Sequence, residues 1–202
     1  MSSRDVILDR VRRNQPDALP LPHLPTLARP LVAPPGLFDD FCSALARMGG
    51  SIGEPSAGES IDDFIRARFP AAQVVCSAVA EVEGTRRIRA GDAPASLDDV
   101  DVGVVRAAFG VAETGSVWLS EAEFGVNALG FLSQHLVVLL DPATIVPNLH
   151  HAYRERGFFE ARYAVLMTGP SATADIEGVL VRGAQGIRTL TVIPSPVSRS
   201  NP

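Results

Sequence analysis

Two short turn-forming segments of this chain carry side chains that could bind or transform a small acid. The first reads Glu113-Thr114-Gly115-Ser116, and the second runs from Thr168 to Thr173 with the sequence TGPSAT. In the first segment a carboxylate, two hydroxyls and backbone NH groups stand close together. This grouping suits a small hydroxy or oxo acid, with Glu113 as base or hydrogen-bond acceptor. An ordinary hairpin turn is the alternative interpretation.

The second segment precedes a predicted helix, whose first NH groups could hold a carboxylate or a phosphate. Asp175 and Glu177 oppose a bound dianion, because they already place negative charge near the helix start. Three interpretations stay open: acidic residues that stabilise the helix terminus, a ligand site, or an interface with arginines of a partner. The candidate ligand-binding residues are Glu113, Thr114, Gly115, Ser116, Thr168, Gly169, Pro170, Ser171, Thr173, Asp175 and Glu177.

Histidine adds one further candidate for acid–base chemistry. His135 begins a predicted strand, and an imidazole titrates near neutrality, so His135 could move protons with Asp141 and Glu113 nearby. A solvated or packed imidazole is the alternative. His150 and His151 are adjacent and point about 100° apart on a helix, which prevents them from clamping one metal ion. We therefore expect no metal site.

Composition excludes several classes of function. The net charge of -5 provides no basic stripe for nucleic acid, and all 18 basic residues are arginine. The absence of lysine excludes a Schiff-base lysine and a phosphate-binding loop of the G-x-x-x-x-G-K type. Cys42 and Cys76 are too few for a disulfide framework or an iron–sulfur ligand set. No apolar run approaches the ~20 residues of a membrane span, and no signal-peptide core is present, so we expect a cytoplasmic protein.

The elements that must position these residues alternate between helix and strand. Apolar runs predict buried strands at 72–80, 136–140, 163–167 and 190–193, and a hairpin from 107–112 and 117–119. Helices are predicted at 2–13, 37–48, after Ser60 and at 147–156. A further helix is predicted after Ser171, with Ile176, Val179, Leu180 and Ala184 on its apolar face, which makes residues 161–194 a strand–helix–strand unit. The alternation predicts a three-layer α/β fold with a mostly parallel sheet and one antiparallel hairpin.

The amino-terminal part of the chain differs from the remainder. Residues 1–36 combine the first helix with an arm rich in proline and leucine, and residues 37–202 are predicted to form the α/β domain. The leucines of the arm argue against its interpretation as a purely flexible spacer. We expect the arm to lie against the domain or against a partner chain, which includes a second copy of this chain.

Two segments also carry a family resemblance. Residues 109–119, FGVAETGSVWL, and residues 167–177, MTGPSATADIE, resemble the A-x-A-E-T-G-T/S and T-G-P-S-x-T-A-D-I-E signatures of the LUD-domain family of lactate-utilisation proteins. The stretch IVPNL at 145–149 matches in order and spacing, and the resemblance spans about residues 37–193. Where the family has V-x-G-x-H-G-P, residues 181–187 read VRGAQGI, so that Gln185 and Ile187 replace the family's histidine and proline.

The resemblance implies a fold similar to the ribose-phosphate isomerase and CoA-transferase superfamily. It also implies a multi-subunit bacterial system that oxidises L-lactate to pyruvate, in which partner subunits carry the iron–sulfur clusters and this chain carries no cofactor. The first hypothesis is accordingly a non-redox subunit of such a system. The alternatives are a stand-alone enzyme or binder of a carboxylated or phosphorylated metabolite, and a scaffold or regulatory module that self-associates through its arm.

Overall fold

The computed structural model describes residues 2–17, 19–20, 36–89, 91–155, 157, 160–175 and 178–197. Its helical elements are α1 (Ser3–Arg13), α2 (Gly36–Arg47), α3 (Ile61–Arg68), η1 (Pro94–Leu97), α4 (Glu121–Phe124), α5 (Leu129–Leu132), η2 (Pro142–Thr144) and α6 (Leu149–Ala152). Its strands are β1 (Ser51–Ile52), β2 (Val75–Ser77), β3 (Arg86–Arg87), β4 (Val102–Arg106), β5 (Phe109–Val111), β6 (Ser116–Ser120), β7 (His135–Leu140), β8 (Ile145–Val146), β9 (Ala164–Met167), β10 (Ala172–Thr173), β11 (Val181–Arg182) and β12 (Thr189–Pro194).

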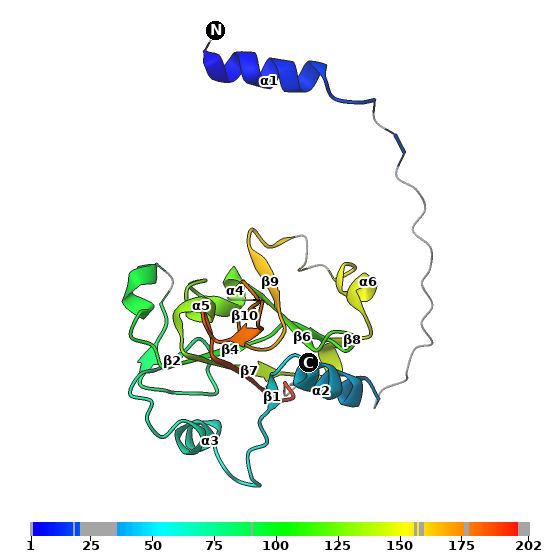
Figure 1. The fold of residues 1–202 in the computed structure, drawn as a ribbon. Helices are drawn as coiled ribbons and strands as arrows, with labels where there is room; N and C mark the ends of the chain where they lie inside the picture. The colour runs from blue at the N-terminus through cyan, green and yellow to red at the C-terminus, as the bar shows by residue number, and fades with distance from the viewer. Residues whose placement is uncertain are drawn as a thin grey trace, which may run out of the picture.

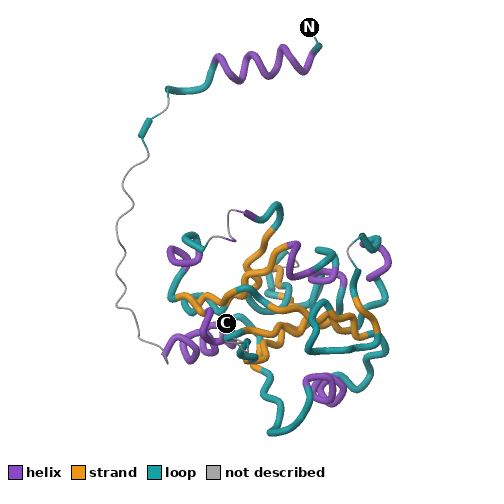
Figure 2. Tube along the Cα trace, turned by 180° about the vertical axis from the view of Figure 1, so that it is seen from behind, coloured by secondary structure: helices purple, strands orange, loops and turns teal. Residues whose placement is uncertain are grey.

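A six-stranded sheet with the order β1-β12-β7-β4-β2-β3 forms the centre of the domain, and all of its neighbouring strands are parallel. Strands occupy the middle of the domain, and the helices lie at its periphery (Figure 2). The inner strands β4, β7 and β12 are buried over most of their length. A strand covered on both faces needs a continuous apolar sequence, which explains runs such as LVVLL at 136–140. The predicted α/β class with a mostly parallel sheet is confirmed.

The two faces of this sheet belong to different layers, because successive side chains of a strand point in opposite directions. Leu136 and Val138 of β7 pack in the same cluster as Phe41 of α2. Val137, between them, packs in a second cluster with Ile65 of α3. Helix α3 therefore covers one face of the sheet, where Figure 1 shows it below the strands, and the separate packing clusters assign α2 to the other face.

A second sheet, with the order β8-β5-β6-β9, packs against the same face as α2. Strands β5 and β6 form the predicted antiparallel hairpin, in which Phe109 pairs with Trp118. Val117 and Leu119 of β6 join the main core. Phe109 and Trp118 are buried in a separate cluster, where they stack with their ring centroids 5.4 Å apart. This second sheet places both signature segments on the α2 side of the molecule.

The strand–helix–strand unit predicted for residues 161–194 is wrong. Strand β9 belongs to the four-stranded sheet and β12 to the six-stranded sheet, and between them β10 and β11 pair as a small antiparallel hairpin. Val179 and Leu180, placed on the buried face of the predicted helix, are 63% and 59% exposed. Glycines explain the difference, because Gly178 and Gly183 adopt positive φ angles of 71° and 72°, which end a helix. Ile176 of the predicted face lies outside the described residues.

Other local predictions are confirmed. Helices α1 and α2 occupy the predicted segments, and the Ser60 side chain accepts a hydrogen bond from the Asp63 NH at 3.1 Å at the start of α3. Helix α1 begins with a capping box of Ser2 and Asp5, and none of its residues is buried. No helix in the described part of the chain has the length and apolar character that crossing a bilayer requires.

Candidate functional site

The two signature turns meet through their hydroxyl groups. Strands β6 and β9 are antiparallel neighbours with Val117 opposite Met167, so Ser116 and Thr168 come to the same end of this ladder. The Ser116 hydroxyl hydrogen-bonds the Thr168 hydroxyl, and it also hydrogen-bonds the Thr114 hydroxyl at 2.7 Å. Residues 52 positions apart in the sequence thus form one hydroxyl cluster, Thr114–Ser116–Thr168.

The glycine of each turn presses against the carboxyl-terminal end of α2. Gly115 has a φ of +68°, and a Cβ placed on it would lie 2.2 Å from the Leu45 nitrogen. Gly169 has a φ of +79°, and a Cβ there would lie 2.5 Å from the Met48 carbonyl oxygen. Both positions therefore need glycine for two reasons, the left-handed backbone and the close approach of another backbone. The two turns and α2 form one fixed unit.

A cavity of about 450 Å³ lies between these three segments, and we call it the signature pocket. Its lining residues come from α2, both turns, α6 and β9: Ala44, Arg47, Met48, Glu113, Thr114, Ser116, Leu149, Leu166 and Thr168. The volume falls within the range of about 300–1,000 Å³ usual for small-molecule sites. Apolar walls with a few convergent polar groups are also typical of such sites.

Opposite charges face this pocket. Glu113 is exposed, and its carboxylate accepts a hydrogen bond from the Leu149 NH at 3.3 Å, while its own NH donates to the Pro147 carbonyl at 3.1 Å. Arg47 lies in the last turn of α2, where a cation interacts favourably with the helix dipole. The pocket therefore offers a cation for an anionic group and a carboxylate for a hydrogen-bond donor.

The hydroxyl cluster is arranged for binding rather than for nucleophilic attack. Among the described residues, Ser116 hydrogen-bonds only the two threonine hydroxyls, and neither can act as its general base. Neither cysteine lines the pocket, and burial raises the pKa of the Cys42 thiol and of the Cys76 thiol, which keeps both protonated. The described residues that line this site thus include neither a cysteine nor a serine that is hydrogen-bonded to a base.

Several residues of the sequence-based list position the site without lining it. Gly115 and Gly169 pack against α2, and Pro170 is buried. Ser171 belongs to the connection with the β10–β11 hairpin, because its NH donates to the Ile187 carbonyl at 3.0 Å and its carbonyl accepts from Gly183 at 2.6 Å.

The predicted anion site at a helix start after Ser171 is wrong, because no helix follows that turn. Thr173 accepts a hydrogen bond from the Asp175 NH at 3.2 Å, and Asp175 is exposed. Neither residue lines the signature pocket. Glu177 lies outside the described residues.

His135 lies apart from the signature pocket. It begins β7, whereas Asp141 follows the other end of this strand, about 20 Å away at the usual rise per residue. His135 and Asp141 therefore do not come together, and His135 does not line the pocket that contains Glu113. The ring stacks on Phe69 at 4.6 Å, and Nδ1 lies 2.8 Å from the Thr189 hydroxyl. Burial lowers its pKa, and the charges of Arg188 and Arg68 lower it further against the opposing effect of Asp101.

Sequence reasoning missed the contribution of α2 and of two apolar side chains. Arg47, Met48, Leu149 and Leu166 line the pocket, but none belongs to the predicted ligand turns. The Gly49-Gly50 pair at the end of α2 could have indicated this contact, because adjacent glycines permit the close approach of another backbone. A Cβ on Gly50 would lie 3.5 Å from the Gly169 Cα.

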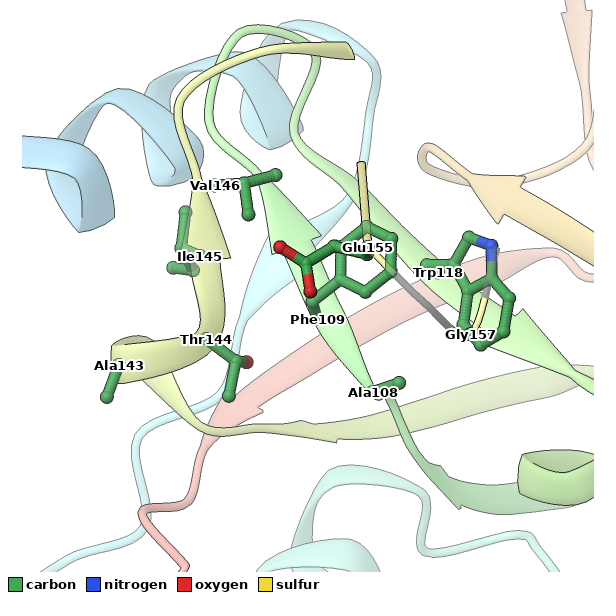
Figure 3. Close-up of a pocket in the computed structure, with 9 residues that line it drawn as sticks. All are labelled: Ala108, Phe109, Trp118, Ala143, Thr144, Ile145, Val146, Glu155 and Gly157. Carbon is green, nitrogen blue, oxygen red and sulfur yellow. The ribbon is translucent and has the colours of Figure 1, made fainter. Parts of the chain in front are cut away.

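Two other cavities lie outside the signature pocket. One cavity of about 360 Å³ lies beside strands β5, β6 and β8 of the second sheet. Figure 3 shows its lining residues, which include Phe109, Trp118 and Glu155. Another of about 340 Å³ lies at the carboxyl ends of β2 and β4, where open α/β sheets often bind ligands. There the Arg106 guanidinium already pairs with Glu81 at 2.7 Å and donates to the Ser195 carbonyl at 2.9 Å. The Arg106 guanidinium is therefore already paired with groups of the protein.

Comparison with known families agrees with the placement of the two signatures. The family model described as LUD domain matches residues 70–193. The chain belongs to the LUD-domain family. The match contains both signature turns but begins after α2, whereas the resemblance seen in the sequence was expected to begin near residue 37.

Two individual proteins are similar to this LUD-domain chain. The uncharacterized protein YkgG of Escherichia coli K12 is 32% identical over 95 residues, which cover 44% of this chain and 41% of that protein. The chain thus aligns with less than half the length of this relative. A crystal structure of a DUF162 family protein from Deinococcus radiodurans matches with a TM-score of 0.58 and 18% identity, covering 79% of this chain and 96% of the other. That similarity establishes the shared fold.

Proposed function

We propose that this LUD-domain protein is a non-redox subunit of a bacterial L-lactate utilisation system, acting in the cytoplasm beside iron–sulfur partner subunits. The observation that carries this proposal is the meeting of both family signatures at one pocket through the Ser116–Thr168 hydrogen bond. Family membership provides the connection to lactate utilisation. The role of the chain is to bind the small carboxylate and to support the partners that remove its electrons.

A non-redox role agrees with the cysteine content. Oxidation of lactate to pyruvate releases two electrons, and an iron–sulfur cluster that accepts them needs several thiolate ligands. The chain has two cysteines, Cys76 in β2 and Cys42 in α2. In the described part of the chain, no three His, Cys, Asp or Glu side chains come together in a way that could hold a metal ion. The clusters therefore belong to the partners in this proposal, and the chain itself needs no cofactor.

Genetic complementation tests this function. The gene is deleted from its native host, and growth on L-lactate as sole carbon source is compared after return of the wild-type gene, a Ser116→Ala/Thr168→Val double variant, or a Ser43→Ala control. Ser43 is exposed on α2 and lines no part of the pocket. We expect growth with the wild type and the control, and a loss of growth with the double variant.

Association with partners is tested separately. The tagged chain is co-expressed with the neighbouring genes of its own genome, and the purified material is examined for iron and for the absorbance of clusters. We expect a cluster-bearing protein to co-purify. A deletion strain that grows normally on L-lactate, together with a chain that purifies alone, would refute the proposal.

The size of the pocket supports one second candidate, a stand-alone binder or enzyme for a larger carboxylated or phosphorylated metabolite. A volume of about 450 Å³ exceeds what lactate alone would fill. A thermal-shift screen with lactate, pyruvate, sugar phosphates and CoA esters separates the two candidates. Stabilisation by a sugar phosphate or CoA ester but not by lactate would favour the second.

A further inference from the structure

Helix α2 is held in a fixed position beside the hydroxyl cluster. Gly115 abuts the backbone of Ala44 and Leu45, and Gly169 abuts the Met48 carbonyl, so both signature turns contact the last turn of α2. Leu45 is completely buried, which fixes the rotation of the helix about its axis. Ala44 and Met48 therefore face the pocket, and Arg47, on the same side of the last turn, lines it with them.

Among the described residues that line the signature pocket, Arg47 is the one cation. Within the described part of the chain, no carboxylate lies within 4.0 Å of its guanidinium. A guanidinium has five NH donors in a planar fork, and this geometry matches the two oxygens of a carboxylate. Its charge is thus available to a ligand, unlike that of Arg106 at the edge of the parallel sheet.

We infer that Arg47 binds the carboxylate of the ligand, and that the ligands of this pocket are 2-hydroxy monocarboxylates with apolar substituents larger than the methyl group of lactate. The inference rests on the proposed function, since it specifies the substrate class of the same pocket. Arg47 lies outside residues 70–193, so the family match assigns it no role.

The remaining lining residues define the other parts of this ligand. The Thr114–Ser116–Thr168 cluster lies where it can exchange hydrogen bonds with the 2-hydroxyl group. Ala44, Met48, Leu149 and Leu166 form an apolar wall for the substituent. Each methylene buried there raises affinity about fourfold, the equivalent of about 0.8 kcal/mol. The Glu113 carboxylate repels a second carboxylate, so a dicarboxylate such as malate binds more weakly.

Isothermal titration calorimetry on the full-length chain tests the inference. The probes are L-lactate, 2-hydroxybutyrate, 2-hydroxyisocaproate and malate. We expect affinity to increase with the apolar substituent and to be lowest for malate. Arg47→Gln should weaken 2-hydroxyisocaproate binding about 10- to 100-fold, the loss expected for a charge-assisted pair, and Arg47→Lys should retain an intermediate affinity.

Arg182→Gln is the matched control. The Arg182 guanidinium lies over Gly49, next to the end of α2, but it does not line the pocket, so binding by this variant should equal that of the wild type. Urea unfolding of each variant verifies that the fold is intact, which is expected because Arg47 is exposed.

Three results would overturn the inference: equal affinity of Arg47→Gln and wild type, equal losses in Arg47→Gln and Arg182→Gln, or no binding of any of the four acids by the wild type. The first two results leave the proposed function unchanged, because that function is judged by growth on L-lactate and by co-purification. The third result would in addition remove the carboxylate-binding role proposed for the chain, whereas growth and co-purification would still test its role as a subunit. A strain that needs the gene for growth while Arg47→Gln binds normally would retain the function and exclude Arg47 as the carboxylate-binding residue.

Discussion

The hydroxyl cluster depends on Ser116, which is 3% exposed and contacts the hydroxyls of Thr114 and Thr168. Ser116→Ala removes the central hydroxyl and leaves both threonines without this partner. We predict a loss of about 1 kcal/mol in the free energy of unfolding, the usual worth of a buried hydrogen bond. Urea denaturation measures it, with Ser43→Ala on the exposed face of α2 as control. Equal unfolding free energies of the two variants would show that the Ser116 hydroxyl forms no stabilising hydrogen bonds.

Gly115 provides a sharper test of how the first signature turn packs on α2. Gly115 and Gly58 both have positive φ angles, +68° and +84°, but a Cβ on Gly58 would meet nothing within 4 Å. Gly58→Ala should therefore cost only the backbone strain of about 1–2 kcal/mol. Gly115→Ala should cost about 1–3 kcal/mol more, because its Cβ collides with the backbone of Leu45. Similar losses in unfolding free energy for both variants would show that α2 does not contact this turn.

His135 should act on stability rather than on ligand binding. Its folded pKa is lowered by burial and by Arg188, so the unfolded chain takes up a proton at a higher pH than the folded chain. The neutral ring therefore makes its full contribution to the free energy of unfolding above about pH 6.5, the ordinary pKa of histidine. This contribution is lost as the pH falls from there to the folded pKa. We predict that His135→Gln flattens the decrease in unfolding free energy below about pH 6.5.

Urea denaturation over a series of pH values measures this change, and the other histidines are identical in both proteins. An imidazole titration by NMR should give His135 a pKa below its ordinary value. Parallel stability curves for wild type and variant, or a raised pKa, would contradict the assignment. Ligand binding by His135→Gln should remain at the wild-type level, since the residue does not line the signature pocket.

At the scale of elements, the sequence predicts strands and helices well where one local pattern decides them. The run LVVLL in β7, the Ser60 cap of α3 and the hairpin around Gly115 each have local causes, and the structure contains all three. The predicted helix after Ser171 failed because two residues of its apolar face, Val179 and Leu180, are exposed between the paired strands β10 and β11. Spacing of apolar residues indicates a helix only if that face is buried, and burial depends on distant segments.

Leu180 distinguishes the hairpin from the predicted helix by experiment. Leu180 is 59% exposed, so Leu180→Ala should change the free energy of unfolding by no more than about 0.5 kcal/mol. On the buried face of a helix the same substitution would cost about 2–5 kcal/mol. Leu190→Ala in β12 serves as control, because Leu190 is completely buried and should show that larger loss. A large loss for Leu180→Ala in urea denaturation would favour the helix.

At the scale of the whole molecule, the candidate site could be predicted only in part. The turns of Glu113–Ser116 and Thr168 were visible because residue types and spacing mark them locally. Their convergence depends on the register of β6 with β9, and the cation comes from α2, more than 60 residues earlier in the chain. Such contacts depend on how sheets and helices pack, which local patterns do not specify. The signature residues therefore identify the pocket, and Arg47 completes it from outside the family match.

The amino-terminal helix α1 is largely exposed. Helix α1 has 11 residues, none of them buried, and Ile7 and Val11 on one of its sides are 61% and 57% exposed. Helices of fewer than about 12–15 residues are marginal in water unless an apolar face is packed. We therefore predict that deletion of residues 1–35 leaves the unfolding free energy and acid binding of the domain unchanged, while it reduces co-purification with the proposed iron–sulfur partner.

Urea denaturation, calorimetry and the co-expression assay measure these three properties on the same truncated chain, and light scattering gives its mass. Substitution of Ile7 and Val11 by serine in the full-length chain is the matched variant, because it removes the apolar side chains and keeps the length of the segment. It should reduce co-purification as the deletion does. A lower mass in solution would instead assign α1 to contact between copies of this chain. A lower unfolding free energy would show that α1 packs on its own domain, since only a contact within the folded chain stabilises it at every protein concentration.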